Sequence, residues 1–264
     1  MRFIKLALAT LLPPPGGARI AMALFYGAVC HVLFALAVLS MIVAMFFGMS
    51  MSMSLGRVPE PYAILANAAL IMQFPVVHSL LLTRKGGGVL ARLAPRQHGK
   101  TLSTTTYAIV ASVQLFALFA LWTPSGTIWW EATGGTFIVL CTLYGLSWLL
   151  LIWASVDAGA EVQSGALGWM SLMQNIRPVF PDMPTRGLFR VIRQPIYAAF
   201  ALTTWTVPVW TLDQLPLAIG LTSYCVLAPL LKERRFAARY GARFTCYQKE
   251  VPYIIPCLFG KKSR

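Results

Sequence analysis

Four apolar segments, each long enough to cross a lipid bilayer, dominate this sequence. They lie at residues 20–48, 61–83, 102–123 and 135–156 and carry no Asp, Glu, Lys or Arg. A transmembrane helix needs about 20 consecutive apolar residues, because its backbone polar groups must be satisfied within the hydrocarbon. Only 11% of the chain is charged, against about 25% in soluble domains. We therefore predict an all-α, polytopic integral membrane protein with one membrane domain over 1–264.

Two shorter apolar segments follow, at 195–210 and 214–231, and prolines such as Pro208 and Pro229 interrupt them. Proline inside a span frees backbone carbonyls, which is tolerated where the helix is buried in protein. Asp213 lies between the two segments and marks a turn. We predict a short, proline-broken helical hairpin, which brings the number of transmembrane helices to about six. A C-terminal cytoplasmic helix is expected after it, and the sequence leaves open whether the hairpin crosses the bilayer completely.

The charged residues indicate the orientation in the membrane. The net charge is +14, and the basic residues collect in the 84–100 loop and in the tail after residue 231. The 124–134 connection carries only Glu131 and is rich in tryptophan, as expected of an outer interface. Positive loops remain in the cytoplasm, so we place both termini there, with 1–19 as a cytoplasmic or interfacial lead segment. This distribution favours contact with membrane lipids over nucleic acid.

Other sequence features exclude some site types. The five cysteines show no metal-binding or disulfide spacing and are expected to be free thiols, so no metal site is predicted. The Gly86-Gly87-Gly88 run lacks the context of a phosphate-binding loop and predicts a flexible connection. Trp169 and Met170 predict a short interfacial helix within the otherwise polar 157–194 segment.

Two histidines fall within the predicted spans. An ionisable side chain in a span is a functional candidate by default. His78, near the inner end of the second span, is equally consistent with a catalytic role and with a hydrogen bond to a neighbouring helix. His31, deep in the first span, is expected to be a packing contact.

The hairpin should bring two polar segments together, because its arms return to the side from which they start. We expect Arg193, Gln194 and Tyr197 to lie near Glu233, Arg234 and Arg235. Such a cluster beside an apolar cavity is typical of a small-molecule site. The alternative is that these residues only anchor the protein to lipid headgroups.

The order of motifs in this region resembles the isoprenylcysteine carboxyl methyltransferase superfamily, which includes phospholipid N-methyltransferases and NnrU-like proteins. The matching residues are R-Q-P-I-Y at 193–197, E-R at 233–234, Y-G at 240–241, Tyr247 and V-P at 251–252. Upstream segments at 73–79, 103–112, 121–124 and 205–211 most closely resemble the membrane thiol methyltransferase branch, the methanethiol S-methyltransferases.

The resemblance implies an S-adenosylmethionine site at the cytoplasmic face, formed by a hairpin and tail at 190–258, and methyl transfer to a small thiol. It implies catalytic roles for Arg193 and Glu233, with His78 as a further candidate. Cofactor-binding residues implied by the motifs are Arg193, Gln194, Pro195, Tyr197, Glu233, Arg234, Tyr240, Gly241, Tyr247, Val251 and Pro252.

Two positions depart from the superfamily pattern. Gln194 replaces a histidine and cannot titrate near neutrality, and Lys232 replaces a glutamate, which reverses the charge. Two alternatives to the methylation of a small thiol stay open. In the first, the acceptor is a prenylcysteine carboxylate or a phospholipid amine. In the second, which these two departures suggest, the protein is a non-catalytic, NnrU-like accessory protein. The oligomeric state is not predicted.

Overall fold

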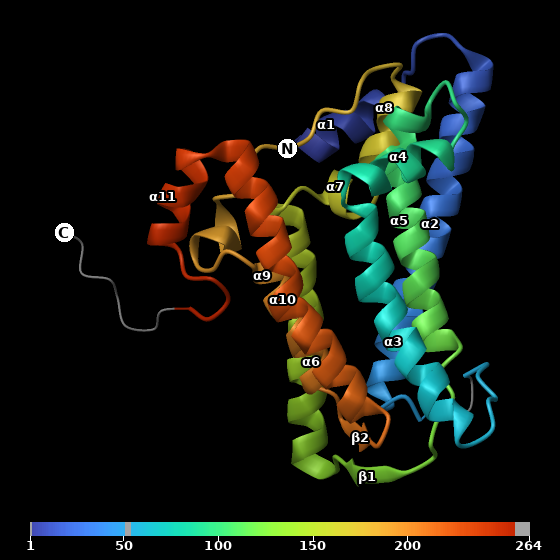
Figure 1. Cartoon of the computed structure of the whole chain (residues 1–264), viewed down its shortest axis with the longest axis vertical. Helices are drawn as coiled ribbons and strands as arrows, with labels where there is room; N and C mark the ends of the chain where they lie inside the picture. Colours follow the sequence, from blue (N-terminus) through green and yellow to red (C-terminus); the bar gives the residue numbers. More distant parts are fainter. Residues whose placement is uncertain (1, 51–53, 257–264) are drawn as a thin grey trace. The chain divides into compact units, whose positions relative to one another are not determined.

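The structure, a computed structural model, describes residues 2–50 and 54–256. It is mainly helical, with one short antiparallel pair of strands (Figure 1). In chain order the elements are α1 (Arg2–Ala9), α2 (Gly17–Phe46), α3 (Tyr62–Leu81), α4 (Arg84–Arg92), α5 (Gly99–Ala120), β1 (Ile128–Glu131), α6 (Gly134–Asp157), α7 (Ala160–Gln163), α8 (Ala166–Met173), η1 (Gly187–Arg190), α9 (Pro195–Trp205), β2 (Val209–Thr211), α10 (Gln214–Tyr240) and α11 (Ala242–Glu250).

Five of these helices, α2, α3, α5, α6 and α10, are long and apolar enough to cross a membrane. The first four confirm the four long spans predicted from the sequence. Their outer faces carry exposed large apolar side chains, such as Leu146, Leu149 and Trp153 on α6. Such exposure is unfavourable in water and natural in lipid. The fold is therefore that of a multi-pass membrane protein.

The chain divides into two compact units, which are described separately. Unit 1 contains residues up to 127 together with 159–181, and its centre is the packing of α2 against α5 and α8. Small residues make this contact close: a Cβ on Gly27 would lie 2.9 Å from the Trp169 ring, and one on Gly168 would lie 2.5 Å from Thr105 Oγ1. The short α8 confirms the helix predicted around Trp169.

Polar side chains join α3 to α5 within unit 1. Gln73 Nε2 donates to the carbonyl of Gln114 at 2.9 Å, and Gln114 Nε2 donates to Gln73 Oε1 at 2.8 Å. Near the ends of the same helices, Asn67 Nδ2 donates to the carbonyl of Thr123 at 2.8 Å. Reciprocal amide bonds of this kind hold membrane helices together where hydrophobic burial cannot.

Unit 2 contains residues 128–158 and those after 181, and its frame is formed by α6, α9 and α10. The backbone N–H of Leu188 donates to Asp157 Oδ2 at 2.8 Å, at one end of α6. At its other end, β1 pairs with β2, and Ala132 N donates to Pro208 O at 2.9 Å. The segment 188–208 therefore runs along the whole of α6.

The predicted short hairpin is only partly correct. Its first arm, α9, has 11 residues and a length of about 16 Å, too short for a full span. Non-helical residues on both sides complete its course beside α6. Its second arm, α10, is not short: it has 27 residues and continues through Pro229 to Tyr240. Good helix formers after residue 231 extend it beyond the apolar part.

Two other expectations are wrong in detail. The fold is not purely helical, because β1 and β2 form a two-stranded sheet whose strands are too short to show a period-2 pattern. Gly86-Gly87-Gly88 is not a flexible connection but part of α4. Thr83 Oγ1 caps this helix by accepting from Gly86 N at 3.1 Å. A Cβ on Gly86 would lie 2.2 Å from the carbonyl oxygen of Leu80, so glycine is required by close packing.

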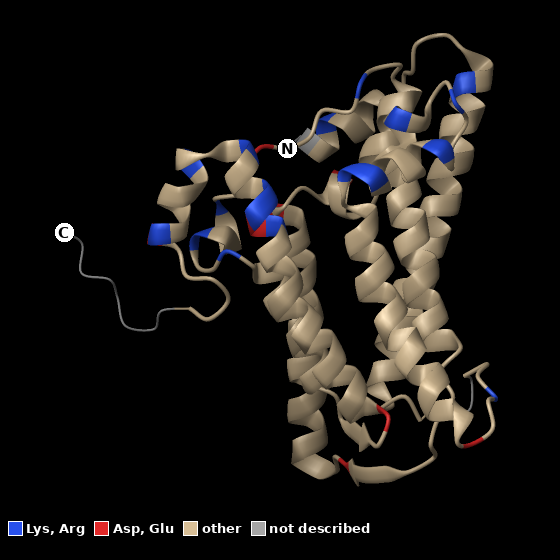
Figure 2. Ribbon diagram, in the orientation of Figure 1, with Lys and Arg blue, Asp and Glu red and all other residues tan. Residues whose placement is uncertain are grey.

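Basic side chains gather at one end of each unit (Figure 2). In unit 1 most of them belong to the start of α2, to α4 and to the start of α5, whereas Arg57 and Glu60 lie in the connection at the opposite ends of α2 and α3. In unit 2 they belong to η1, the end of α10 and α11, whereas Glu131 and Asp213 lie near the paired strands. Each unit thus has one basic end and one end with few charges and no excess of basic side chains.

Candidate functional site

A buried carboxylate, Glu233, organises the basic end of unit 2. It receives Arg193 Nε at 2.8 Å and Arg193 Nη2 at 3.3 Å, one on each carboxylate oxygen. Gln194 Nε2 and Gln248 Nε2 each donate to it at 2.8 Å. Its side chain is only 10% exposed, and that of Arg193 only 12%. A carboxylate so placed has every strong acceptor position filled.

Local sequence explains how these donors reach one point. Pro195 begins α9, since it needs no N–H partner in the first turn. Arg193 and Gln194 therefore lie just before the helix, where their backbone N–H groups are free to pair with another segment. Glu233 lies on the antiparallel α10, which packs against α9.

The C-terminal tail is held by the same residues. Backbone N–H groups of Arg193 and Gln194 donate to the carbonyls of Pro252 and Tyr253, at 2.9 and 3.1 Å. Arg193 Nη1 donates to the carbonyls of Gln248, at 3.0 Å, and Val251. One arginine thus joins the start of α9, the end of α10 and the tail.

A second anchor of the tail is an aromatic cluster. Phe244 and Tyr247 on α11 are buried with Met183, and Tyr240 packs beside them. Tyr247 Oη donates to the carbonyl of Phe189 at 2.6 Å. Burial raises the pKa of the Tyr247 phenol to about 12, so it remains a neutral donor.

An exposed ion pair lies beside this cluster. Arg243 Nη2 approaches Asp182 Oδ2 at 2.7 Å, and Asp182 Oδ1 accepts from Met183 N at 2.8 Å. The Arg243 hydrogen bond, with help from the Met183 N–H, holds the pKa of the Asp182 carboxyl below its usual range. The pair therefore ties the 182–183 segment to α11.

Lys232 occupies the interior next to Glu233. Its Nζ donates to Gln194 Oε1 at 3.2 Å. It also lies 5.5–5.7 Å from the ring centroids of Phe189, Tyr197 and Phe236. A void of about 10 Å³ adjoins it, with walls formed by Pro184, Phe189, Arg193, Gln194, Lys232, Glu233, Phe236, Phe244 and Tyr247. Such a void holds about one water-sized atom.

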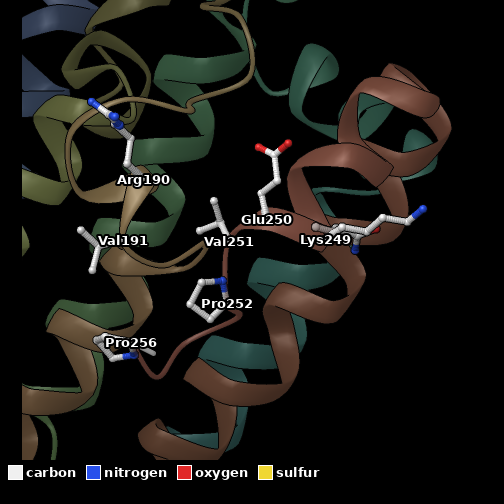
Figure 3. Close-up of a pocket in the computed structure, with 8 residues that line it drawn as sticks. Arg190, Val191, Lys249, Glu250, Val251, Pro252 and Pro256 are labelled. Atoms are coloured by element: carbon white, nitrogen blue, oxygen red, sulfur yellow. The ribbon is translucent and has the colours of Figure 1, made fainter. Parts of the chain in front are cut away.

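A larger hollow is lined by residues of the tail (Figure 3). Its volume is about 370 Å³, within the range of small-molecule sites. Val191, Val251 and Pro252 form its apolar wall, and Arg190 and Glu250 extend from its rim. Gln248, Lys249 and Pro256 complete the lining. Its walls thus combine apolar contact, a cation and a carboxylate.

The structure brings the predicted residues to this region with different surroundings. Arg193, Gln194 and Glu233 meet as expected, and Val251 and Pro252 line the larger hollow. The remaining predicted residues have other environments: Pro195 starts α9, Tyr197 packs against Tyr224, Arg234 is exposed, Tyr240 packs against Phe236, Gly241 forms the α10–α11 turn at φ 54°, and Tyr247 is buried.

Sequence reasoning missed three residues that contribute to the site. Gln248 bonds the carboxylate of Glu233, and Arg190 and Glu250 flank the hollow. Gln248 and Glu250 lie in the tail next to the motif residues Tyr247 and Val251, and this position could have identified them as site residues. No sequence feature distinguishes Arg190, because arginines are frequent throughout the basic end.

The two histidines of the predicted spans, His31 and His78, lie in unit 1. His78 Nε2 and Tyr107 Oη are 2.5 Å apart, and the His78 ring packs 4.9 Å from that of Phe74. His31 Nε2 accepts from Trp169 Nε1 at 3.1 Å, which is the packing contact expected of it. The catalytic role of His78 stays a prediction.

Comparison with known proteins gives an independent line of evidence. The chain is 27% identical over 199 residues to the methanethiol S-methyltransferase of Pseudomonas deceptionensis, which covers 75% of this chain and 74% of that protein. It is 26% identical over 246 residues to the methanethiol S-methyltransferase of Pseudomonas sp. (strain GM41(2012)), covering 91% and 92%. The Mycobacterium tuberculosis enzyme of the same name is 26% identical over 200 residues, covering 75% and 80%.

No protein-family model matches the chain, and no solved structure matches it significantly. The predicted resemblance to the methanethiol S-methyltransferases is nevertheless confirmed over three quarters or more of the chain, whereas membership of the wider superfamily stays a prediction. The chain is a distant homologue of the methanethiol S-methyltransferases.

Proposed function

We propose that this protein is a membrane-embedded, S-adenosylmethionine-dependent methyltransferase that methylates a small thiol such as methanethiol. The observation that carries the proposal is the joining of the 193–197 motif, Glu233 and the Val251–Pro252 tail through Arg193, beside a hollow of about 370 Å³. The relatives carry the same activity in their names.

The lining of the hollow fits the methyl donor. Arg190 offers bidentate donors for a carboxylate, and Glu250 offers an acceptor for an ammonium or for ribose hydroxyls. Val191, Val251 and Pro252 offer an apolar wall for an adenine ring. When bound, S-adenosylmethionine would supply an electrophilic methyl group on a positively charged sulfur.

The protein's own contribution is positioning. Holding two reactants in line can lower the barrier by about 7–11 kcal/mol. In this proposal Arg193 and Glu233 act by fixing the tail that forms one wall of the site, because their polar atoms are already bonded within the protein. This differs from direct cofactor contact, which the motifs implied for both residues.

From the positive-inside rule we infer that the basic end of each unit, and with it each terminus, faces the cytoplasm. A water-soluble methyl donor would reach the hollow from there, and a small apolar thiol would arrive from the membrane or from water. Lipid acceptors and an accessory role are the competing outcomes of the following test.

The test uses purified full-length protein in a detergent in which it stays folded. Calorimetric titration should detect binding of S-adenosylmethionine and of S-adenosylhomocysteine. Addition of methanethiol should release dimethyl sulfide, measured in the headspace, in equal amount to S-adenosylhomocysteine. The Arg190→Met variant should weaken binding, whereas Arg186→Met, outside the hollow, is the matched control. Binding without turnover of any thiol would favour a lipid acceptor, and absence of binding would refute the enzyme proposal.

A further inference from the structure

Helix α4, in unit 1, is packed against the end of a long apolar helix. The candidate span α3 ends at Leu81, and α4 begins at Arg84. The contact is close, because a Cβ on Gly86 would lie 2.2 Å from the carbonyl oxygen of Leu80. A span ends where the hydrocarbon meets the lipid headgroups, so a helix packed on that end lies at the level of the headgroups.

The apolar side chains of α4 lie on two sides of the helix. Gly86 and Leu90 are buried, where α4 contacts α3 and α5. Val89 and Leu93 are instead 47% and 57% exposed, and their spacing of four residues places them on one side. Exposed apolar side chains at the level of the headgroups are typical of helices that lie in the membrane interface, where they contact the acyl chains.

The rest of the exposed surface of α4 is basic. Arg84, Lys85 and Arg92 are all exposed, and in the described part of the chain none of them makes an ion pair. The carboxylates of unit 1 do not compensate them, since Glu60 lies at the opposite end of α3 and Glu161 is buried. The charge of these three side chains therefore remains for an anion from outside the protein.

Gly88 lies at the centre of the three cations. It is four residues from Arg84 and from Arg92 and three from Lys85, so all three are its neighbours on the helix surface. A Cβ on Gly88 would meet nothing within 4 Å, so no other element covers this position. The missing side chain leaves room for a phosphate group to approach the helix between the cations.

We propose that the exposed face of α4 binds an anionic phospholipid such as phosphatidylglycerol. Its phosphate lies over Gly88 among the three cations, and its acyl chains lie beside Val89 and Leu93. Arginine and lysine bind phosphate through charge-assisted hydrogen bonds. The interaction surface lies outside the proposed methyl-donor site and does not depend on the proposed function.

The first helix of the chain supports a lipid partner rather than a nucleic acid. Gln174 Nε2, at the end of α8, holds α1 by donating to the carbonyl of Ala9 at 2.6 Å. The same end of α8 packs in one cluster with Ala94, which follows α4 directly, so α1 and α4 lie at the same end of unit 1. On α1, Ile4 and Leu8 are exposed. Acyl chains accept such apolar side chains, whereas the phosphate backbone of a nucleic acid does not.

The test counts the lipids that purified full-length protein retains in detergent, by native mass spectrometry. Phosphatidylglycerol and phosphatidylcholine with the same acyl chains are added in equal amounts, and the natural protein should retain phosphatidylglycerol selectively. Lys85→Gln combined with Arg92→Gln should weaken the binding of the first phosphatidylglycerol about 25-fold, because each basic residue at the surface contributes about fivefold. The matched control, Arg235→Gln with Arg239→Gln, removes two exposed charges from α10 and should leave this binding nearly unchanged.

A second variant keeps every cation and changes only the centre of the surface. Gly88→Glu places a carboxylate among Arg84, Lys85 and Arg92, so it should remove the preference for phosphatidylglycerol. Gly88→Ala is its control and should keep the preference. Both substitutions introduce better helix formers than glycine at an exposed position, so both variants should fold, which thermal unfolding checks.

Four results overturn the proposal. The first is equal retention of the two lipids by the natural protein, and the second is equal weakening by the α4 and α10 double variants, which shows that only net charge acts. Displacement of the lipid by inorganic phosphate shows that the acyl chains beside Val89 and Leu93 contribute nothing. Displacement by a short RNA shows a surface for nucleic acid instead.

Discussion

Replacing Glu233 by glutamine tests how the tail is held. The change keeps the shape of the side chain but removes the charge that receives Arg193, Gln194 and Gln248. Removing one partner of a buried ion pair costs about 3–5 kcal/mol, because the remaining charge is left uncompensated. Arg193 and Glu233 are 12% and 10% exposed, so solvent can replace little of the lost interaction.

The loss should appear first in the segment that Arg193 fixes, residues 242–256. Hydrogen-exchange mass spectrometry of this tail should show opening that is more frequent by about two to three and a half orders of magnitude, since about 1.4 kcal/mol corresponds to a factor of ten. Glu250→Gln, on the same tail but exposed, is the matched control and should leave exchange nearly unchanged. Exchange in Glu233→Gln within tenfold of the natural protein would contradict the assignment of the ion pair as the tail's anchor.

Two further predictions concern packing and pH. Gly86→Ala should destabilise unit 1 by more than about 1 kcal/mol, because the new Cβ would meet the Leu80 carbonyl. In the control Gly87→Ala the Cβ meets nothing within 4 Å, so this variant should be as stable as the natural protein or more stable in thermal unfolding. Equal effects of the two substitutions would refute the packing argument. The pKa of Asp182 is lowered in the folded state by Arg243, so the stabilisation by this pair should be present above the ordinary value of 3.8 and lost as the pH falls through the lowered one. Proteolysis of the tail between pH 6 and pH 3 should show this loss, and Asp182→Asn should remove it; an unchanged pH dependence in that variant would rule the pair out as its cause.

The long membrane helices were predictable because each satisfies a one-dimensional rule. A run of apolar residues as long as the hydrocarbon is thick must be helical, whatever its neighbours are. The predicted hairpin likewise implied that Arg193 and Gln194 meet Glu233, because a hairpin returns its ends to one side. Neither inference needed knowledge of side-chain packing.

Predictions from local sequence were wrong where contacts between distant segments determine the secondary structure. Gly86 is helical because α4 packs against the end of α3, a contact that no local propensity encodes. β1 and β2 pair although they are 78 residues apart, counted from Glu131 to Val209. Short strands of this kind gain their stability from the partner alone.

The sequence by itself predicted helices long and apolar enough to cross a membrane, basic connections distinct from nearly uncharged ones, and a motif pair related to thiol methyltransferases within a basic region. Only the tertiary structure decided which charges remain available there. Arg193 and Glu233 neutralise each other, whereas Lys232 faces inward among aromatic rings. The physical reason is that hydrogen-bond partners are set by three-dimensional proximity, so the availability of a charge cannot be read from its identity.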